Sequence, residues 1–278
     1  MTPGMNGVPN QTDGSRRDFL RKLIAGAAFA PPLLASFSLN GRSLTAAEGS
    51  VALPFCFNFS SESQYLDNFT DILRSTDIDA GTDLAGDNHP SLNITGQTGS
   101  GGSTWATMVA GPSVANVLLR ADVLIHRFDN RKGVGFLALA FALPGGKGLA
   151  LVISNAGNTD RLELMTVDTA GKVLPLATQS LGAGIAEDAW YHLTMQIQQP
   201  GCDQGVCSIR VKGQVFRHTD PGNPNSGLGL QVGPTLDVPL KFALAGPVSG
   251  GVGIVARAVS SFVDSSVTNF CGEEVIPA

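Results

Sequence analysis

Hydrophobic and polar residues alternate between residues 189 and 216. Tyr191, Leu193, Met195 and Ile197 occupy one set of alternate positions, and mostly polar residues occupy the other. Residues 207–216 repeat this alternation. A period of two is typical of a strand with one buried face and one solvated face. The two segments therefore predict a pair of half-buried strands, joined by a loop over residues 200–206.

Short strand-like segments continue along the chain, separated by turn residues. Residues 133–143 and 148–154 are apolar on both faces, which predicts central strands. The acidic stretch 77–87 is expected to be a loop, and no long segment after residue 47 has the period of a helix. Many short strands with Gly- and Pro-rich turns predict an all-β sandwich or barrel. The remaining predicted strands are residues 53–60, 65–72, 91–96, 104–110, 115–128, 161–167, 172–179, 228–232, 240–244, 253–258 and 261–270.

The charge distribution narrows the possible partners. Of the 18 basic and 23 acidic residues, five and two lie before residue 48, so residues 48–278 carry a formal net charge of about −8. A domain this acidic is disfavoured as a binder of nucleic acid or of an anionic membrane. About 230 residues are enough for one all-β domain with a sizeable core.

The N-terminal segment contains a paired arginine, Arg16 and Arg17, followed by Phe-Leu and a modest apolar run. It resembles the bacterial twin-arginine export signal, which implies passage through the twin-arginine translocation machinery and a periplasmic or secreted location. Residues 1–47 are then a cleaved signal peptide, and residues 48–278 are the mature domain. The alternative, a retained anchor, is disfavoured by Pro31 and Pro32 within the run, so no stable membrane span is expected in the mature protein.

Four cysteines in an exported chain predict two disulfides. Cys202 and Cys207 flank a short loop, where a bridge would clamp two strands together. Cys56 and Cys271 lie near the two ends of the mature chain and can bridge if the first and last strands are neighbours. A four-cysteine zinc site is the alternative, although the spacing of these cysteines does not favour it.

The segment from Glu187 to Met195, EDAWYHLTM, resembles a strand of laminin-G-like domains. These domains belong to the concanavalin A-like lectin/glucanase superfamily. The stretches 211–215 (VKGQV) and 250–255 (GGVGIV) resemble two further strands of that group, and the similarity extends over residues 53–272. The resemblance implies an all-β jelly-roll sandwich of two antiparallel sheets, whose concave face binds sugars in some members.

The catalytic motifs of this superfamily are incomplete in the chain. Its glycosidases use paired glutamates on one strand, and no such run is present. Its alginate lyases use Arg, Gln, His and Tyr on concave strands. Arg120, Asp122 and His126 share one face of the predicted strand 115–128, and His192 could lie opposite them. Tyr191, however, is one of only two tyrosines and is predicted to point into the core.

A polar groove on the outward face of these strands is the main binding hypothesis. The alternative is an ordinary solvated face with Trp190 beneath a loop, which the low aromatic content of 6% favours because sugars stack on exposed rings. The candidate ligand-binding residues are Asn116, Arg120, Asp122, His126, Trp190, His192, Thr194, Gln196 and Arg210.

Calcium is the one cofactor that the resemblance implies. Asp67 and Asp264 are the candidate ligands near the first and last strands. The acidic residues of the predicted loop, Asp77, Asp79, Asp83 and Asp87, are an alternative set of oxygen ligands. Simple solvation of all these carboxylates is the remaining alternative.

The leading functional hypothesis is an exported, non-catalytic β-sandwich module that binds carbohydrate or recognises a cell surface. A polysaccharide lyase or glycoside hydrolase of the same fold is the first alternative. A purely structural or adhesive domain is the second. Two carboxylates on one face of a groove would favour the enzyme, and exposed aromatic rings would favour a lectin.

Overall fold

The chain divides into two units, Met1–Glu48 and Gly49–Ala278, and the computed structural model describes parts of each. In the first unit, β1 (Ser38–Leu39) pairs antiparallel with β2 (Arg42–Ser43). The expected signal residues Arg16 and Arg17 lie outside the described part of the chain. The described residues are 38–39, 42–43, 51–73, 78–83, 89–97, 103–126, 132–155, 159–182, 184–258 and 262–276.

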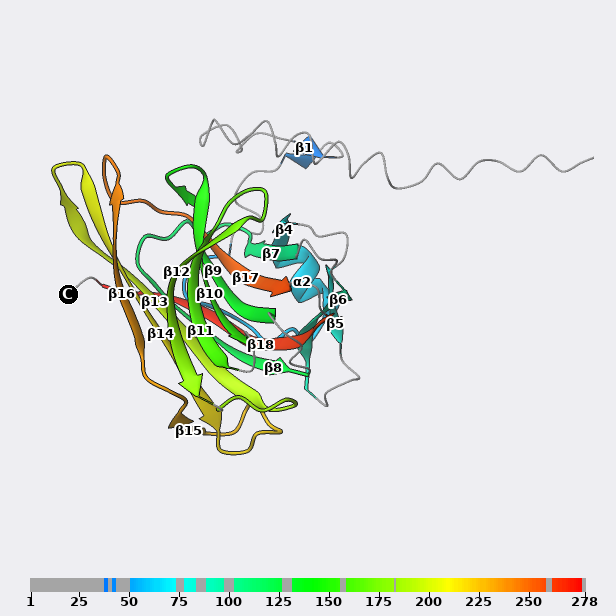
Figure 1. The fold of residues 1–278 in the computed structure, drawn as a ribbon. Helices are drawn as coiled ribbons and strands as arrows, with labels where there is room; N and C mark the ends of the chain where they lie inside the picture. Colours follow the sequence, from blue (N-terminus) through cyan, green and yellow to red (C-terminus); the bar gives the residue numbers. More distant parts are fainter. Residues whose placement is uncertain are drawn as a thin grey trace, which may run out of the picture. The chain divides into compact units, whose positions relative to one another are not determined.

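The second unit is a sandwich of two antiparallel sheets that lie face to face (Figure 1). The seven-stranded sheet has the order β12 (Val173–Gly182), β11 (Asp160–Val167), β10 (Lys147–Asn155), β9 (Lys132–Leu143), β17 (Gly251–Ala258), β7 (Ser103–Val109) and β4 (Phe69–Leu73). The nine-stranded sheet has the order β15 (Leu228–Gln231), β14 (Val206–His218), β13 (Trp190–Asp203), β8 (Val117–Ile125), β18 (Phe262–Glu274), β6 (Ser91–Gln97) and β5 (Ile78–Asp83). In addition, β16 (Leu236–Ala243) pairs with β14, and β3 (Phe55–Phe57) pairs with β18. The predicted all-β jelly-roll sandwich is confirmed.

The alternating pattern along β13 becomes the division between core and surface. Tyr191, Leu193, Met195 and Ile197 are fully buried between the sheets, in one cluster with apolar residues of β9 and β10. Thr194 and Gln196 lie on the opposite face and are half-buried. The strands β9 and β10, predicted to be central because they are apolar on both faces, occupy interior places in the seven-stranded sheet.

Two predictions about the start of the domain are wrong. Residues 65–72 were expected to form one strand, but the helix α2 (Glu62–Asn68) precedes β4, since a short apolar run fits either period. The acidic stretch was expected to be a loop, but β5 pairs with β6 at the edge of its sheet, where charged residues are tolerated. In the described part of the chain, no helix has both the length and the apolar character required to cross a membrane.

All four cysteines form disulfides, in the two predicted pairs. Cys56 and Cys271 lie directly opposite each other on β3 and β18, which places the first and last strands of the sandwich side by side. Cys202 and Cys207 lie opposite each other at the end of the β13–β14 hairpin. The alternative zinc site made of cysteines is therefore wrong, because no cysteine is left as a thiolate.

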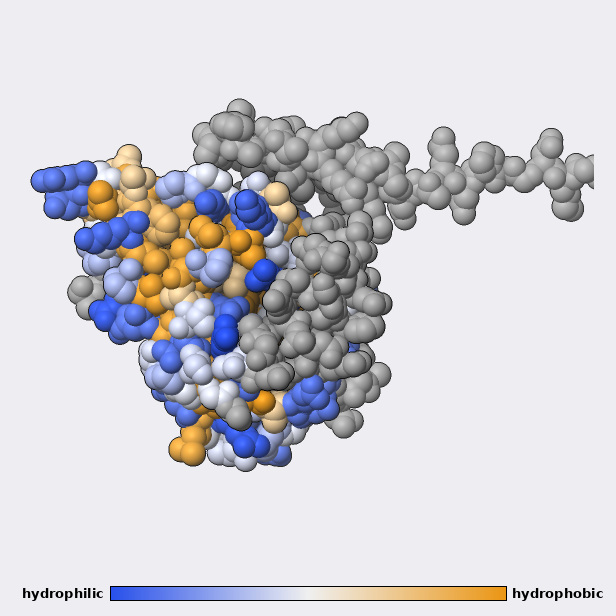
Figure 2. All heavy atoms as spheres, viewed as in Figure 1, coloured by the Kyte–Doolittle hydropathy of each residue, from blue (hydrophilic) through white to orange (hydrophobic). Residues whose placement is uncertain are grey.

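One edge of the sandwich is apolar where β12 and β16 approach each other. Figure 2 shows hydrophobic surface over β9 to β12, extending toward β16. Leu176 and Ala177 of β12 and Leu240 and Phe242 of β16 pack against the core from this edge while remaining partly exposed. The two sheets are thus not closed into a barrel at this edge.

We expect the two disulfides to contribute unequally to stability. The bridge between Cys56 and Cys271 spans 215 residues, and the bridge between Cys202 and Cys207 spans five. Loop-closure entropy predicts that removing the long bridge lowers the free energy of unfolding by roughly 3 kcal/mol more than removing the short one. Urea unfolding of the Cys56→Ala/Cys271→Ala and Cys202→Ala/Cys207→Ala proteins tests this. Equal losses would contradict it.

Candidate functional site

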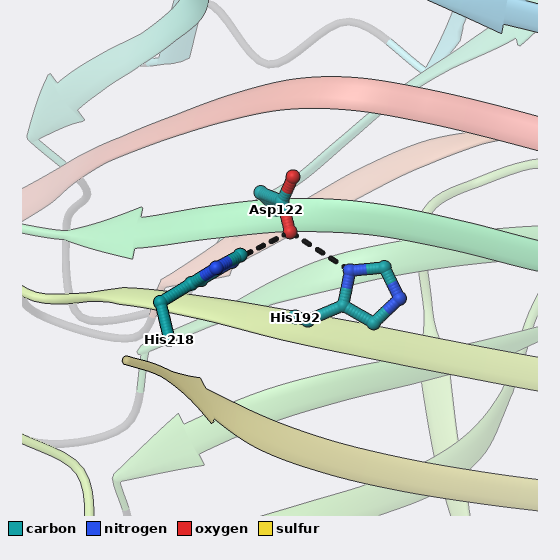
Figure 3. Close-up of side chains that lie close together, drawn as sticks. All are labelled: Asp122, His192 and His218. Atoms are coloured by element: carbon teal, nitrogen blue, oxygen red, sulfur yellow. Dashed lines mark hydrogen bonds and ion pairs between the residues drawn. The ribbon is translucent and has the colours of Figure 1, made fainter. Parts of the chain in front are cut away.

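A buried carboxylate on the outer face of the nine-stranded sheet is bonded to two histidines (Figure 3). Asp122 of β8 and His192 of β13 are directly opposite each other in the sheet. His192 is in turn opposite Phe216 of β14, and His218 lies two residues further along β14 on the same face. Three adjacent strands therefore supply one residue each.

The carboxylate of Asp122 is surrounded by hydrogen-bonding groups. Its Oδ1 lies 2.8 Å from His192 Nδ1 and 2.8 Å from His218 Nε2. Its Oδ2 accepts a hydrogen bond of 2.7 Å from the side-chain amide of Asn269. The side chains of Asp122, His218 and His192 are 4%, 2% and 16% exposed. We refer to Asp122, His192, His218 and Asn269 as the Asp122 cluster.

Local backbone features place the outer members of the Asp122 cluster. Asn269 has a left-handed φ of 50° at an irregularity in the pairing of β18 with β8, where the register shifts between Thr268 and Cys271. Asn tolerates this conformation better than most residues, and a bulge re-aims its side chain. His218 Nδ1 donates to the Ser226 carbonyl oxygen over 3.1 Å, so the loop after β14 fixes the ring.

The loop over residues 219–227 is ordered by its own side chains. Asp220 accepts a hydrogen bond from the backbone N–H of Gly222, and Asn223 accepts one from Asn225. Both are Asx turns, which short polar side chains favour. The carbonyl of Pro221 accepts a bond from the backbone N–H of Trp190, which ties the loop to the start of β13. The loop therefore covers the face at the end where the Asp122 cluster lies.

Asp122 and His218 shift each other's pKa toward the charged form. Burial disfavours an ionised carboxylate, but hydrogen bonds from His192, His218 and Asn269 outweigh it and hold the pKa of Asp122 below its ordinary value. Burial likewise disfavours a charged His218, and the bond to Asp122 with its negative charge raises the pKa of this imidazole above its ordinary value. Because the Ser226 carbonyl only accepts, Nδ1 of His218 keeps its proton, and Nε2 donates to Asp122 only when the ring is doubly protonated.

A polar hollow of about 400 Å³ lies next to the Asp122 cluster on the same face. Thr194 is two residues from His192 and shares its side of β13, so the hollow begins one row beyond the cluster. Leu118, opposite Gln196, is its apolar member. The lining residues are Leu118, Thr194, Gln196, Lys212, Gln214, Thr235 and Asp237, from β8, β13, β14, β16 and the segment before β16.

The candidate residues predicted from sequence fall into separate places. Thr194 and Gln196 line the hollow, and Asp122 and His192 form the cluster beside it. Arg120 is opposite Thr194 and pairs with Glu273 at 2.8 Å. Arg210 makes two hydrogen bonds of 2.7 Å to Asp237 at the rim of the hollow.

The other three candidates on this face are held in structural contacts. Asn116 accepts a hydrogen bond from the backbone N–H of Gln199. His126 bonds Asp188 through Nδ1 and Ser266 through Nε2. Trp190 is 2% exposed, so its ring offers no stacking surface to a sugar.

The structure places the two calcium candidates on different elements. Asp67 is an exposed residue of α2, and Asp264 lies within β18 opposite Thr95. Neither belongs to a group of possible metal ligands; among the described residues that group is Asp122, His192 and His218. Asp77 and Asp87 lie outside the described residues, and Asp79 and Asp83 are backbone positions of β5.

Several residues of the site escaped the sequence-based prediction. The predicted strand ended at Phe216, two residues before His218. Extending the alternating pattern to residue 218 would have put His218 on the same face as Phe216. Asn269 depends on an irregularity in the sheet that has no clear sequence signal. Gln214 could have been found from alternation, since it is opposite Thr194, whereas Thr235 and Asp237 required the pairing of β14 with β16.

We expect the contribution of the Asp122–His218 pair to stability to peak in weak acid. The raised pKa of His218 gives a contribution that is complete below its ordinary value of 6.5 and is lost as pH rises through the raised value. The lowered pKa of Asp122 also contributes to stability. This contribution is complete above the ordinary aspartate pKa of 3.8 and is lost as the pH falls through the lowered pKa. Urea unfolding with EDTA present should therefore show a larger loss for Asp122→Asn at pH 5.5 than at pH 9.

The exposed Asp203, at the tip of the β13–β14 hairpin, provides the matched control. Asp203→Asn removes the same charge from a solvated position, so its effect should be small and similar at both pH values. An equal loss of stability for Asp122→Asn at pH 5.5 and pH 9 would contradict the pairing.

No protein-family model matches the sequence, and no curated protein matches it. Solved structures match by fold. The PL-14 alginate lyase from Aplysia kurodai is 12% identical, with 81% of this chain and 100% of that chain covered and a TM-score of 0.51. A legume lectin-like domain from Entamoeba histolytica is 11% identical, with 82% and 100% covered and a TM-score of 0.49.

An engineered GH43 glycoside hydrolase with endo-xylanase and exo-arabinofuranosidase activity is 10% identical, with a TM-score of 0.51. The match covers 85% of this chain and 43% of that chain. Identities this low establish the fold and leave the activity open. Residues 49–278 thus form a jelly-roll β-sandwich, a fold that this chain shares with the alginate lyase and the GH43 hydrolase.

Proposed function

We propose that the protein is an exported, non-catalytic module that binds a glycan in the polar hollow on the outer face of the nine-stranded sheet. The observation that carries this proposal is the hollow itself, which is lined mainly by polar residues from adjacent strands. A hollow of about 400 Å³ is in the size range of small-ligand sites. The fold, which an alginate lyase shares, adds support for a glycan ligand by analogy.

The chemistry of the lining suits hydroxyl groups. Thr194 and Thr235 each offer a donor and an acceptor, and Gln196 and Gln214 offer amides that both donate and accept. Gln214 is already oriented by contacts of its amide nitrogen with Gln231 and Thr235, at 3.3 and 3.1 Å. A sugar ring with several hydroxyls can replace the water bound to these groups at little cost in hydrogen bonds.

Most of the charges named on this face are held in ion pairs. Arg120 pairs with Glu273, and Arg210 pairs with Asp237. Lys212 is opposite Asp237 in the β14–β16 pairing. A surface with compensated charges favours a neutral glycan over a polyanionic one.

A glycan-active enzyme is the second candidate function, and the Asp122–His192 pair favours it. Nδ1 of His192 faces the carboxylate, so in a neutral ring Nε2 carries the lone pair and is able to accept a proton. This pair lies one row of residues from the hollow. A base at that position would abstract a proton from a sugar or from water.

Export by the twin-arginine route is part of the proposal. Arg16 and Arg17 provide the sequence motif, with cleavage after residue 47. The two disulfides support an oxidising destination, the periplasm or the exterior of the cell.

We expect Gln196→Ala to weaken glycan binding by about tenfold, which corresponds to the loss of one or two hydrogen bonds. A glycan array, probed with CaCl2 and with EDTA, would identify the ligand, and isothermal titration calorimetry would give the affinity of each variant. Gln179→Ala is the matched control, because Gln179 lies on β12 of the other sheet and donates to the Ser180 carbonyl. The Gln179→Ala protein should bind the glycan with the same affinity as the unmodified protein.

Failure to bind any glycan would overturn the proposal and leave a structural or adhesive role. An equal loss of affinity in Gln196→Ala and Gln179→Ala would remove the hollow as the binding site. Shortening of the bound glycan during incubation, detected as new reducing ends or unsaturated products, would favour the enzyme instead.

We expect replacement of Arg16 and Arg17 by lysine to block export. Residues 1–47 fused to a reporter that folds in the cytoplasm should deliver it to the periplasm of a bacterium that has the twin-arginine machinery. Because this machinery recognises the arginine pair, the Arg16→Lys/Arg17→Lys fusion should stay in the cytoplasm. Equal periplasmic delivery of both fusions would contradict the proposed route, and recovery of the reporter in the membrane fraction would indicate a retained anchor.

A further inference from the structure

The close contact between His218 and Asp122 in the Asp122 cluster cannot be a hydrogen bond if the imidazole ring is neutral. Nδ1 of His218 donates to the Ser226 carbonyl, so in a neutral ring Nε2 is an acceptor. That nitrogen lies 2.8 Å from Oδ1 of Asp122, which is also an acceptor. Two acceptors at this distance repel each other unless a cation lies with them, either a second proton on the ring or a metal ion.

The same oxygen atom is also approached by a second ring. Nδ1 of His192 lies 2.8 Å from Oδ1 of Asp122, and Figure 3 shows both imidazoles directed at that atom. One ligand atom each from Asp122, His192 and His218 lies within 4.8 Å of the others. Ligands of a tetrahedral zinc ion at its usual bond lengths are separated by about 3.3 Å, so small side-chain movements would bring these three atoms to coordination distance.

Outer contacts fix two of the three ligands, as is usual in metal sites. The Ser226 carbonyl holds His218 with Nε2 directed inward. Asn269 occupies Oδ2 of Asp122 over 2.7 Å and leaves Oδ1 as the coordinating atom. Metal-bound histidines almost always donate their other ring N–H to a carbonyl or carboxylate, and metal-bound carboxylates are themselves hydrogen-bonded.

We propose that Asp122, His192 and His218 bind one Zn²⁺ ion, or a divalent transition metal of similar preference, on the outer face of the nine-stranded sheet. Two imidazole nitrogens and one carboxylate oxygen are ligands that zinc and its first-row neighbours favour. Calcium and magnesium prefer oxygen ligands, so this site differs in chemistry from the calcium site that Asp67 and Asp264 were expected to form. Three protein ligands leave one coordination position for water or another ligand. The site stands independently of glycan binding, because none of its three ligands lines the hollow.

Isothermal titration calorimetry of the whole chain, purified without a polyhistidine tag and dialysed against EDTA, tests the proposal with ZnCl2 as the probe. We expect one Zn²⁺ per chain. Loading with Co²⁺ should give the intense visible absorption of a tetrahedral cobalt centre, which is a readout independent of any activity. Calcium chloride should give no binding at this site.

The variants separate a built site from surface binding. His192 is the most exposed of the three ligands, so His192→Ala should fold, as circular dichroism can verify, and should weaken Zn²⁺ binding by at least tenfold. His126→Ala is the matched control on the same face, because His126 bonds Asp188 and Ser266 outside the cluster. This variant should keep its affinity and its cobalt spectrum.

A second variant, at another of the three proposed metal ligands, tests whether the loss of Zn²⁺ binding comes from the loss of a ligand. Asp122→Asn keeps the shape of the side chain but removes its charge, and it should also lose the cobalt absorption. No Zn²⁺ binding by the unmodified protein would overturn the proposal and leave a proton as the cation in the cluster. Unchanged affinity in His192→Ala, or an equal loss in His126→Ala, would likewise overturn it.

Discussion

The pairing register of β13 with its two neighbours determines both the core and the site. It places Tyr191 and Leu193 between the sheets and His192 opposite Asp122 on the outer face. A slip of one residue would exchange these two faces and would put polar side chains into the core, so the register is strongly specified. The same alignment sets Thr194 opposite Gln214, and both side chains line the hollow. Packing energy thus positions the side chains of the candidate site.

A buried anion is the second element on which this face depends. An isolated carboxylate at the depth of Asp122 would be strongly destabilising, and its surroundings compensate with three hydrogen bonds. One of those partners, Asn269, requires an irregular backbone, and another, His218, requires the loop over residues 219–227 to supply the Ser226 carbonyl. Trp190 is buried where that loop returns to the sheet. The aromatic residue that sequence alone suggested for ligand binding is therefore part of the support of the face.

The sequence predicted the strands better than the site because alternation is a local signal. It is sufficient for β13, whose core residues alternate without interruption, and for β9 and β10, which are apolar on both faces. It fails at α2, where a run of a few residues around Tyr65 fits two periods, and at β5, which tolerates acidic residues because it has one neighbour. Asp122 and His192 were found because each lies on a regular strand. His218, Asn269 and Asp237 depend on a loop, a bulge and a distant strand, none of which is encoded in adjacent residues.

The bridge between Cys56 and Cys271 makes the polypeptide from β3 to β18 a covalent ring. Within such a ring, cutting one peptide bond leaves a single molecule rather than two fragments. A protease that cuts the exposed loop around Gly222 would create new chain ends without releasing either sheet. This closure means that one cut within the ring does not release a strand.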